Sequence, residues 1–200
     1  MTNRRQILQI GITATAWPLA SRAAQAAGRN VSGRGAVQLY KVIYDKRFED
    51  SVSFARRAAA LGLPLEAIEG DMTRFWYDDL YHVWKQDPVA IAGLTAHGPM
   101  FCFEQIGRDQ GMRVVFSAEH RFGAGVVEHE FSGPLAMLSH GMAVESRPGW
   151  SACMADVIAE CPGGRTEIST AQAMTAVPRQ AVAADADSLF SWVIAPAVKV

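Results

Sequence analysis

The 200-residue sequence lacks most of the signatures that would assign it to a known chemistry. Only 3 cysteines are present and no Cys-x-x-Cys motif occurs, which excludes c-type haem attachment and a thioredoxin-like redox motif. The sequence also lacks a Gly-x-Ser-x-Gly nucleophile motif, a His-Glu-x-x-His metal motif, and the Gly-x-x-x-x-Gly-Lys and Gly-x-Gly-x-x-Gly phosphate-binding loops. The common hydrolase and nucleotide-binding mechanisms therefore have none of their usual sequence elements here.

An excess of one charge is missing too, because 19 basic residues stand against 20 acidic ones. Proteins that bind a phosphate backbone carry a basic patch, so we expect no nucleic-acid partner. Beyond the N-terminal segment there is no run of about 18 apolar residues, the length of a membrane-spanning helix, and we expect no membrane span in the mature chain. Half of the residues are apolar and 20% are charged, which is typical of one globular domain.

What the sequence does contain begins with an unusual N-terminal segment. No acidic residue precedes Asp45, and a basic start is followed by an apolar stretch and then by small residues. The stretch Thr2-Asn3-Arg4-Arg5-Gln6-Ile7-Leu8-Gln9 resembles the twin-arginine (Tat) motif of signal peptides. Small residues at Ala24 and Ala26 suit a signal peptidase, so we expect a Tat-type signal peptide over residues 1–26 and cleavage before Ala27.

The Tat resemblance implies export of an already folded protein to the periplasm or the medium. Two common reasons for exporting a folded protein are a cofactor inserted in the cytoplasm and a partner subunit assembled there. Residues 27–36 are rich in glycine, arginine and serine, and we expect a flexible linker there. The single folded domain should then span residues 37–200.

Strand-like and helix-like patterns alternate between residues 37 and 121. Strands are expected at 39–44, 65–68, 88–93 and 113–121, and helices at 48–61, 72–85 and 95–110. Such alternation is typical of βαβ units with right-handed crossovers. We therefore predict an α/β fold with three layers and a mostly parallel sheet.

The pattern changes after Arg121, where a glycine-rich stretch at 122–125 separates two strand-like segments. An antiparallel hairpin is expected there as an extension of the sheet. Residues 135–142 are ambiguous, and 148–161 should form a C-terminal helix. Residues 188–200 are apolar enough to return to the domain as a strand or extended segment.

Polar residues follow the ends of three predicted parallel strands: Asp45 and Arg47, then Asp71 and Thr73, then Thr95 and His97. In an open parallel sheet the ligand crevice lies beyond the carboxyl ends of the strands, where the strand order switches. Helix N-termini predicted at Thr73 and Thr95 would favour an anionic group, so a small anionic ligand is expected. The alternative is that Asp71, Thr73 and Thr95 merely cap helices while Arg47 is a solvated charge.

A second candidate site consists of His120 and His129 in the predicted hairpin. A four-residue turn would place them diagonally on one face, about 7 Å apart at the backbone, within reach of one divalent metal ion. Glu119, Glu128 and Glu130 would point to the other face, and a third ligand would have to come from His97, His140 or Glu104. The alternative is a pair of partly buried, hydrogen-bonded histidines near a sheet edge.

The three cysteines allow two interpretations in an oxidising compartment. Cys153 and Cys161 would lie about 12 Å apart along one helix, too far for a disulfide. Either Cys102 pairs with one of them, or all three are small buried hydrophobic residues.

Two functions fit these observations best. The first is an accessory or small subunit of a Tat-exported redox enzyme, folded onto a larger cofactor-bearing subunit before export. The alternative is a self-contained periplasmic small-molecule-binding protein or metal-dependent enzyme. A purely structural secreted protein is a third reading, and the motifs after residue 26 resemble no family.

Overall fold

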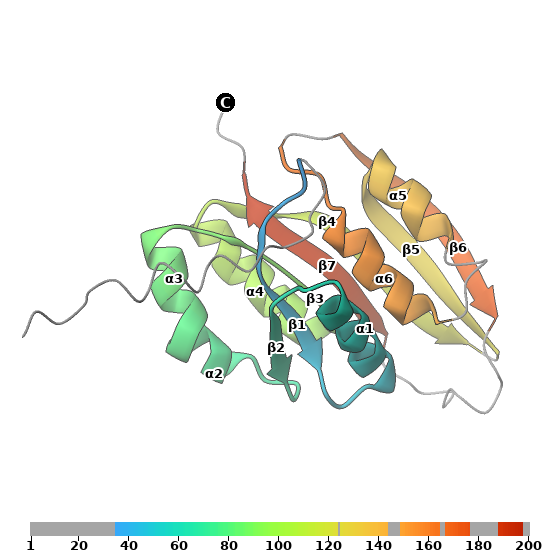
Figure 1. Cartoon of the computed structure of the whole chain (residues 1–200), viewed down its shortest axis with the longest axis horizontal. Helices are drawn as coiled ribbons and strands as arrows, with labels where there is room; N and C mark the ends of the chain where they lie inside the picture. Colours follow the sequence, from blue (N-terminus) through green and yellow to red (C-terminus); the bar gives the residue numbers. More distant parts are fainter. Residues whose placement is uncertain (1–34, 124, 144–148, 165–166, 177–187, 198–200) are drawn as a thin grey trace, which may run out of the picture.

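A computed structural model describes residues 35–123, 125–143, 149–164, 167–176 and 188–197 (Figure 1). The expected signal peptide and cleavage position lie outside these residues, as does most of the expected linker. Within the linker range, Gly35 and Ala36 pair with the segment around Pro162, where the Gly163 amide donates to the Gly35 carbonyl at 2.7 Å.

A 7-stranded sheet with the order β2-β1-β3-β7-β4-β5-β6 forms the centre of the molecule. Its strands are β1 (Leu39–Asp45), β2 (Leu65–Ile68), β3 (Ala90–Ala96), β4 (Met112–Gly123), β5 (Val126–Pro134), β6 (Ile168–Ala176) and β7 (Leu189–Pro196). The helices are α1 (Glu49–Ala60), α2 (Thr73–Phe75), the π-helical turn η1 (Trp76–Leu80), α3 (Tyr81–Gln86), α4 (His97–Asp109), α5 (Leu135–Met142) and α6 (Trp150–Ala159).

The predicted α/β class is confirmed, but the sheet is mixed rather than mostly parallel. Only β1–β2 and β1–β3 are parallel neighbours, whereas the other four neighbouring pairs are antiparallel. The reason is β7, which the C-terminal segment forms as expected but which inserts between β3 and β4. β7 is antiparallel to both, so β4 keeps the direction of β3 without being its neighbour.

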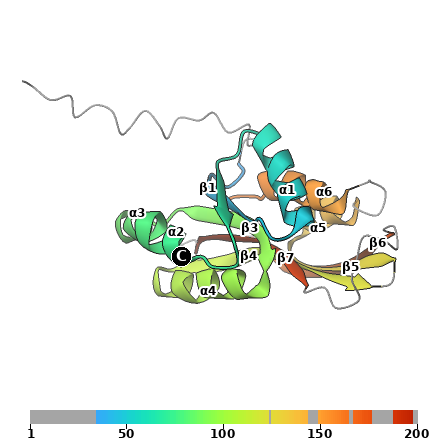
Figure 2. The ribbon, with the colours of Figure 1, turned by 90° about the horizontal axis from the view of Figure 1, so that it is seen from below.

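Helices lie on both faces of the sheet, but they cover its two halves unequally. On one face α1, α5 and α6 pack over a core that reaches from β1 to β6, and Arg57 of α1 forms an ion pair with Asp156 of α6 at 2.6 Å (Figure 2). On the other face α2, η1, α3 and α4 cover a second core built mainly on β1, β3 and β7, to which Ile68 of β2 and Met112 of β4 also belong. Among the described residues this second core includes none from β5 or β6, so one face of that half is uncovered.

The segment 72–85, expected to be one helix, is α2, η1 and α3 in succession. After Met72, its buried apolar residues are Phe75, Leu80 and Trp84. Phe75 and Leu80 are five positions apart, a spacing that a regular α-helical turn does not place on one side but a π-helical turn does. The wide turn therefore lets all three side chains reach the second core.

The cysteines differ from the expectation of three buried side chains. Cys153 and Cys161 are buried beside α6, whereas Cys102 is exposed on α4. Because α4 and α6 lie on opposite faces of the sheet, a bridge from Cys102 to either would have to cross it. Burial raises the pKa of the Cys161 thiol to about 12, so it stays protonated at neutral pH.

No helix of the described residues is long and apolar enough to cross a membrane.

Candidate functional site

The first candidate, which we call the strand-end site, comprises the six polar residues expected beyond strands β1, β2 and β3. These strands are neighbours and parallel, so their carboxyl ends do meet at one edge of the sheet. The residues are Asp45, Arg47, Asp71, Thr73, Thr95 and His97. Their side chains are nevertheless held largely by nearby protein groups.

Asp45 and Arg47 form a tight ion pair at the end of β1. The Asp45 carboxylate is fully buried and accepts hydrogen bonds from Arg47 Nε at 3.0 Å and Nη2 at 2.7 Å. The guanidinium lies directly against Gly70, where a Cβ atom would approach Arg47 Cζ to 2.4 Å. Gly70 also has φ of +80°, so this turn both needs glycine and fixes the arginine. Contact between Arg47 and Gly70 thereby joins the connection after β1 to the connection after β2. The Ser51 hydroxyl also accepts a hydrogen bond from the Asp45 amide and donates one to the Leu94 carbonyl of β3.

The remaining strand-end residues serve mainly local structure. Asp71 is exposed and accepts a hydrogen bond from the Thr73 amide at 2.8 Å, and hydrogen bonding from the Thr73 side chain and then from this amide lowers the pKa of its carboxyl. Thr95, expected at a helix N-terminus, instead lies buried in β3 and accepts a hydrogen bond from Trp192 Nε1 at 3.2 Å. The helix begins two residues later at His97, whose ring stacks on Phe101. Thr95 therefore supplies no anion-binding helix end.

The second candidate is the histidine pair of the β4–β5 hairpin, whose register differs from the expected one. The strands stay paired up to Gly123 and Val126, so two residues rather than four form the turn, and Gly125 adopts φ of +86°. His120 consequently lies directly opposite His129 instead of diagonally. The prediction that both rings share one face is correct.

The two imidazoles form the centre of a hydrogen-bond chain across four neighbouring strands. His120 Nδ1 and His129 Nδ1 are 2.7 Å apart, His120 Nε2 is 2.9 Å from the Ser191 hydroxyl, and His129 Nε2 is 3.0 Å from the Thr175 hydroxyl. All four residues are buried, and the Trp150 ring covers both imidazoles at 4.4 and 5.3 Å between centroids. We call this set the histidine chain.

Burial keeps the histidine chain uncharged. It lowers the pKa of His129 to about 4, and burial together with the neighbouring His129 lowers the pKa of His120 well below its usual value. With neutral rings, one Nδ1 donates and the other accepts. The chain can therefore run in either of two directions, from the Ser191 hydroxyl towards Thr175 or the reverse.

A metal ion is not what this arrangement suits best. All four ring nitrogens of His120 and His129 are already in hydrogen bonds. The third ligands considered from the sequence lie elsewhere: His97 is on α4 at the opposite face, His140 pairs with Glu160, and Glu104 pairs with Arg108. Within the described part of the chain, no three His, Cys, Asp or Glu side chains converge on a point where an ion would fit.

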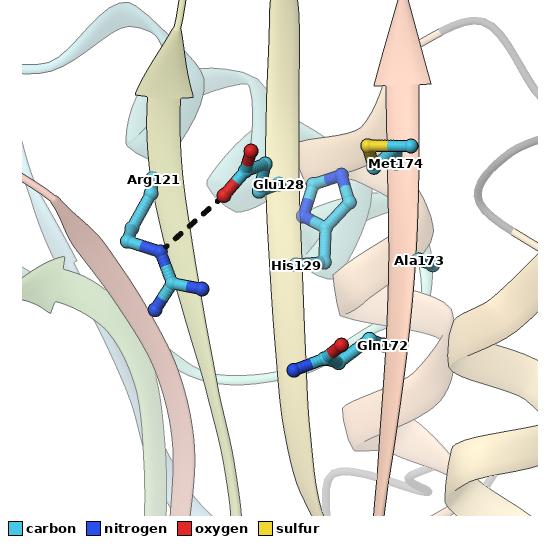
Figure 3. Close-up of a pocket in the computed structure, with 6 residues that line it drawn as sticks. All are labelled: Arg121, Glu128, His129, Gln172, Ala173 and Met174. Atoms are coloured by element: carbon cyan, nitrogen blue, oxygen red, sulfur yellow. Dashed lines mark ion pairs between the residues drawn. The ribbon is translucent and has the colours of Figure 1, made fainter.

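A third feature, the open face, is the side of β5, β6 and the hairpin end of β4 that no helix of the described residues covers. It contains Arg121 with ion pairs to Glu119 at 3.1 Å, Glu128 at 3.6 Å and Glu130 at 3.1 Å. A hollow of about 300 Å³ is lined by Arg121, Glu128, His129, Gln172, Ala173 and Met174 (Figure 3). Sequence reasoning placed the three glutamates on this side, but it did not foresee that no helix in the described part of the chain would cover them.

Comparisons with known proteins add no assignment to this geometry. No protein-family model matches the chain, and searches of curated proteins and of solved structures found no similar protein.

Proposed function

We propose that the protein is an exported accessory subunit that docks through its open face onto a larger redox subunit exported with it. The observation that carries this proposal is the unequal covering of the sheet. The described helices cover both faces of the β1–β3–β7 half but only one face of β5 and β6. A sheet face of this kind is the usual place for another protein to pack.

The composition of the open face indicates the chemistry of the partner. Three carboxylates surround one guanidinium, so the patch has a net negative charge, and all four side chains are between 32% and 51% exposed. Exposed ion pairs contribute little to stability, so the fold does not require this concentration of charge. A partner surface rich in lysine or arginine would complement it and speed association.

The N-terminal resemblance supports the same function. A Tat leader carries folded proteins, and a small subunit without a cofactor motif of its own has reason to use it when it is assembled with its partner before export. The periplasm, or the medium, is then the proposed location of the complex.

The test is native mass spectrometry of the complex purified from the periplasmic fraction of the source cells. We expect a stoichiometric larger subunit that carries a redox cofactor, and replacing Arg4 and Arg5 by lysine should retain the chain in the cytoplasm. Glu130→Lys should release the subunit, whereas Glu69→Lys, the same charge change beside Lys46 far from the open face, should not. A chain purified without any larger subunit would contradict the proposal.

A second candidate function is a self-contained small-molecule-binding protein or enzyme that uses the strand-end site. It is favoured by the strand order, because β2 and β3 flank β1 and the connections cross opposite faces, which makes the β1–β3 boundary a switch point. Inorganic phosphate is the simplest probe of a small anion there. Under this function Asp71→Ala and His97→Ala should weaken phosphate binding in calorimetry more than they lower stability. Equal losses of stability with unchanged binding would assign both residues to structure.

A divalent metal at the histidine pair belongs to the same second candidate. Metal analysis of the purified protein tests it directly, with His120→Phe as the variant that removes one ligand. A stoichiometric ion that is lost in the variant would favour the enzyme over the accessory subunit.

A further inference from the structure

Strand β6 ends the sheet with one edge that no strand of the described residues pairs. Its nine residues, Ile168–Ala176, include no charged residue and no proline. Natural proteins usually protect a long edge strand with lysine, proline or a bulge, because its free amide and carbonyl groups can pair with another chain. β6 pairs with β5 in an unbroken register over its whole length, so it has none of these protections.

On one side of β6, the side chains are arranged nearly symmetrically about Gln172, the central residue of the strand. Alanines 171 and 173 flank it, and the hydroxyl residues Ser169 and Thr175 lie three positions away on either side. If two copies paired antiparallel, Gln172 would face its counterpart, Ala171 would face Ala173, and Ser169 would face Thr175. Small residues and hydroxyl pairs are compatible across antiparallel strands, and no like charges would be opposed.

Exposed apolar side chains gather at the same end of the sheet. Among the described residues, four of the seven exposed large hydrophobic side chains belong to β6 and the adjoining helix α5: Ile168, Met174, Leu135 and Met142. Leu135 directly follows Pro134, and Pro134 pairs with Ile168. Leu135 and Ile168 therefore lie at the same end of β6. An edge bordered by apolar side chains on the helix side and on the open face has more area to bury than strand pairing alone provides.

We propose that two copies of the chain associate through antiparallel pairing of β6 with β6, which joins their sheets into one continuous sheet around a two-fold axis at Gln172. The near-symmetry of Ser169, Ala171, Ala173 and Thr175 about Gln172 is what selects a second copy as the occupant, since an isologous contact requires a surface that complements itself. This proposal uses the edge of the sheet and does not depend on the accessory function, which uses the open face.

Sedimentation velocity of the purified protein over a range of concentrations tests the association. We expect a species of twice the 21.7 kDa chain mass, or twice the mass of the processed chain if the leader has been removed. Gln172→Lys should weaken association at least about tenfold, because two ammonium groups would face each other across the axis. Gln110→Lys is the matched control, as Gln110 is exposed at the end of α4, and it should leave the dimer intact.

A position-specific cross-link makes the test independent of that variant's folding. In a Cys102→Ser background, which removes the exposed thiol, Gln172→Cys should form a disulfide-linked dimer that reductant reverses, whereas Gln110→Cys should not. A chain that stays monomeric at every concentration overturns the proposal. So does a dimer that neither Gln172→Lys weakens nor Gln172→Cys cross-links, because it would use another surface.

Discussion

The two halves of the sheet place their polar groups differently. In the parallel half of β1, β2 and β3, polar side chains gather at the strand ends, where Asp45 is held by Arg47 against Gly70. In the antiparallel half of β4, β5 and β6, they alternate along the strands, with the histidines buried on one face and the glutamates exposed on the other. The parallel half thus uses its polar groups to shape connections, while the antiparallel half divides them between a buried chain and a free surface.

This difference shows that a polar cluster foreseen from sequence is not by itself a binding site. The strand-end residues do meet at one edge, yet their hydrogen bonds are largely made to one another and to the backbone. On the open face the polar side chains form exposed ion pairs instead of buried hydrogen bonds. Removing its charges should therefore have little effect on the fold. Substitutions in the two halves should therefore lower the free energy of unfolding by different amounts.

The largest effect is expected for Gly93→Ala in the parallel half. A Cβ atom at Gly93 would lie 2.6 Å from the Ile43 carbonyl oxygen and 2.8 Å from Trp192 Cζ2, and a backbone atom cannot move aside as a flexible side chain can. We expect a loss of about 3 kcal/mol in the free energy of unfolding, measured by urea denaturation. Gly98→Ala is the control, because nothing lies within 4 Å of its Cβ position; similar losses in the two variants would contradict the packing described.

The histidine chain should account for the next largest effect. His120→Phe leaves the Nδ1 atom of His129 and the Ser191 hydroxyl without their partner in a buried site, which should cost about 1–3 kcal/mol of unfolding free energy. Adding His129→Phe removes the orphaned imidazole, so the double variant should lose less than the sum of the single ones. Additive losses in chemical denaturation would mean that the two rings are not coupled.

The same chain predicts a pH dependence of stability. The pKa of His129 is about 4 in the fold against about 6.5 in an unfolded chain, and the pKa of His120 is lowered as well. Below pH 6.5 the unfolded chain therefore binds protons that the folded chain does not, and stability falls as the pH falls towards 4. The slope should approach about 1.4 kcal/mol per pH unit for each histidine, and thermal unfolding of the His120→Phe/His129→Phe variant should lose most of it. An unchanged slope in that variant would show that other groups cause it.

The smallest effect is expected for Arg121→Ala on the open face. Its three ion pairs are exposed, so the unfolding free energy should change by no more than about 0.5 kcal/mol. Differential scanning calorimetry at moderate salt is the measurement. A loss as large as that of His120→Phe would mean that the fold itself depends on this cluster.

The sequence predicted individual strands and helices better than their arrangement in the sheet. The patterns at 39–44, 48–61 and 65–68 correspond closely to β1, α1 and β2, because each depends on local spacing and on nearby glycine or proline. The position of β7 could not be foreseen, since its pairing with β3 and β4 joins residues between 69 and 103 positions apart in sequence, from His120↔Leu189 to Ile91↔Ile194. Because β7 pairs antiparallel with both β3 and β4, the sheet is mixed, whereas a mostly parallel sheet was predicted.

The candidate sites show the same division between local and distant information. Strand alternation correctly placed His120 and His129 on one face, but the turn length that fixes their register depended on Gly123 continuing β4. The partner Thr175 comes from β6, a strand that sequence reasoning did not assign, and Ser191 comes from β7, whose place in the sheet it did not assign. Thr95 was misplaced because the strand runs three residues beyond its expected end at Gly93, where the backbone needs a residue without a side chain.

The central position of β7 also has a consequence during synthesis. Residues 189–196 are synthesised after the six other strands of the described sheet. They nevertheless lie between β3 and β4 and contribute Trp192, Val193 and Ile194 to the interior. The two halves consequently have no shared strand until residues 189–196 have been synthesised. A truncated product that ends before Leu189 therefore lacks the strand that joins β3 to β4.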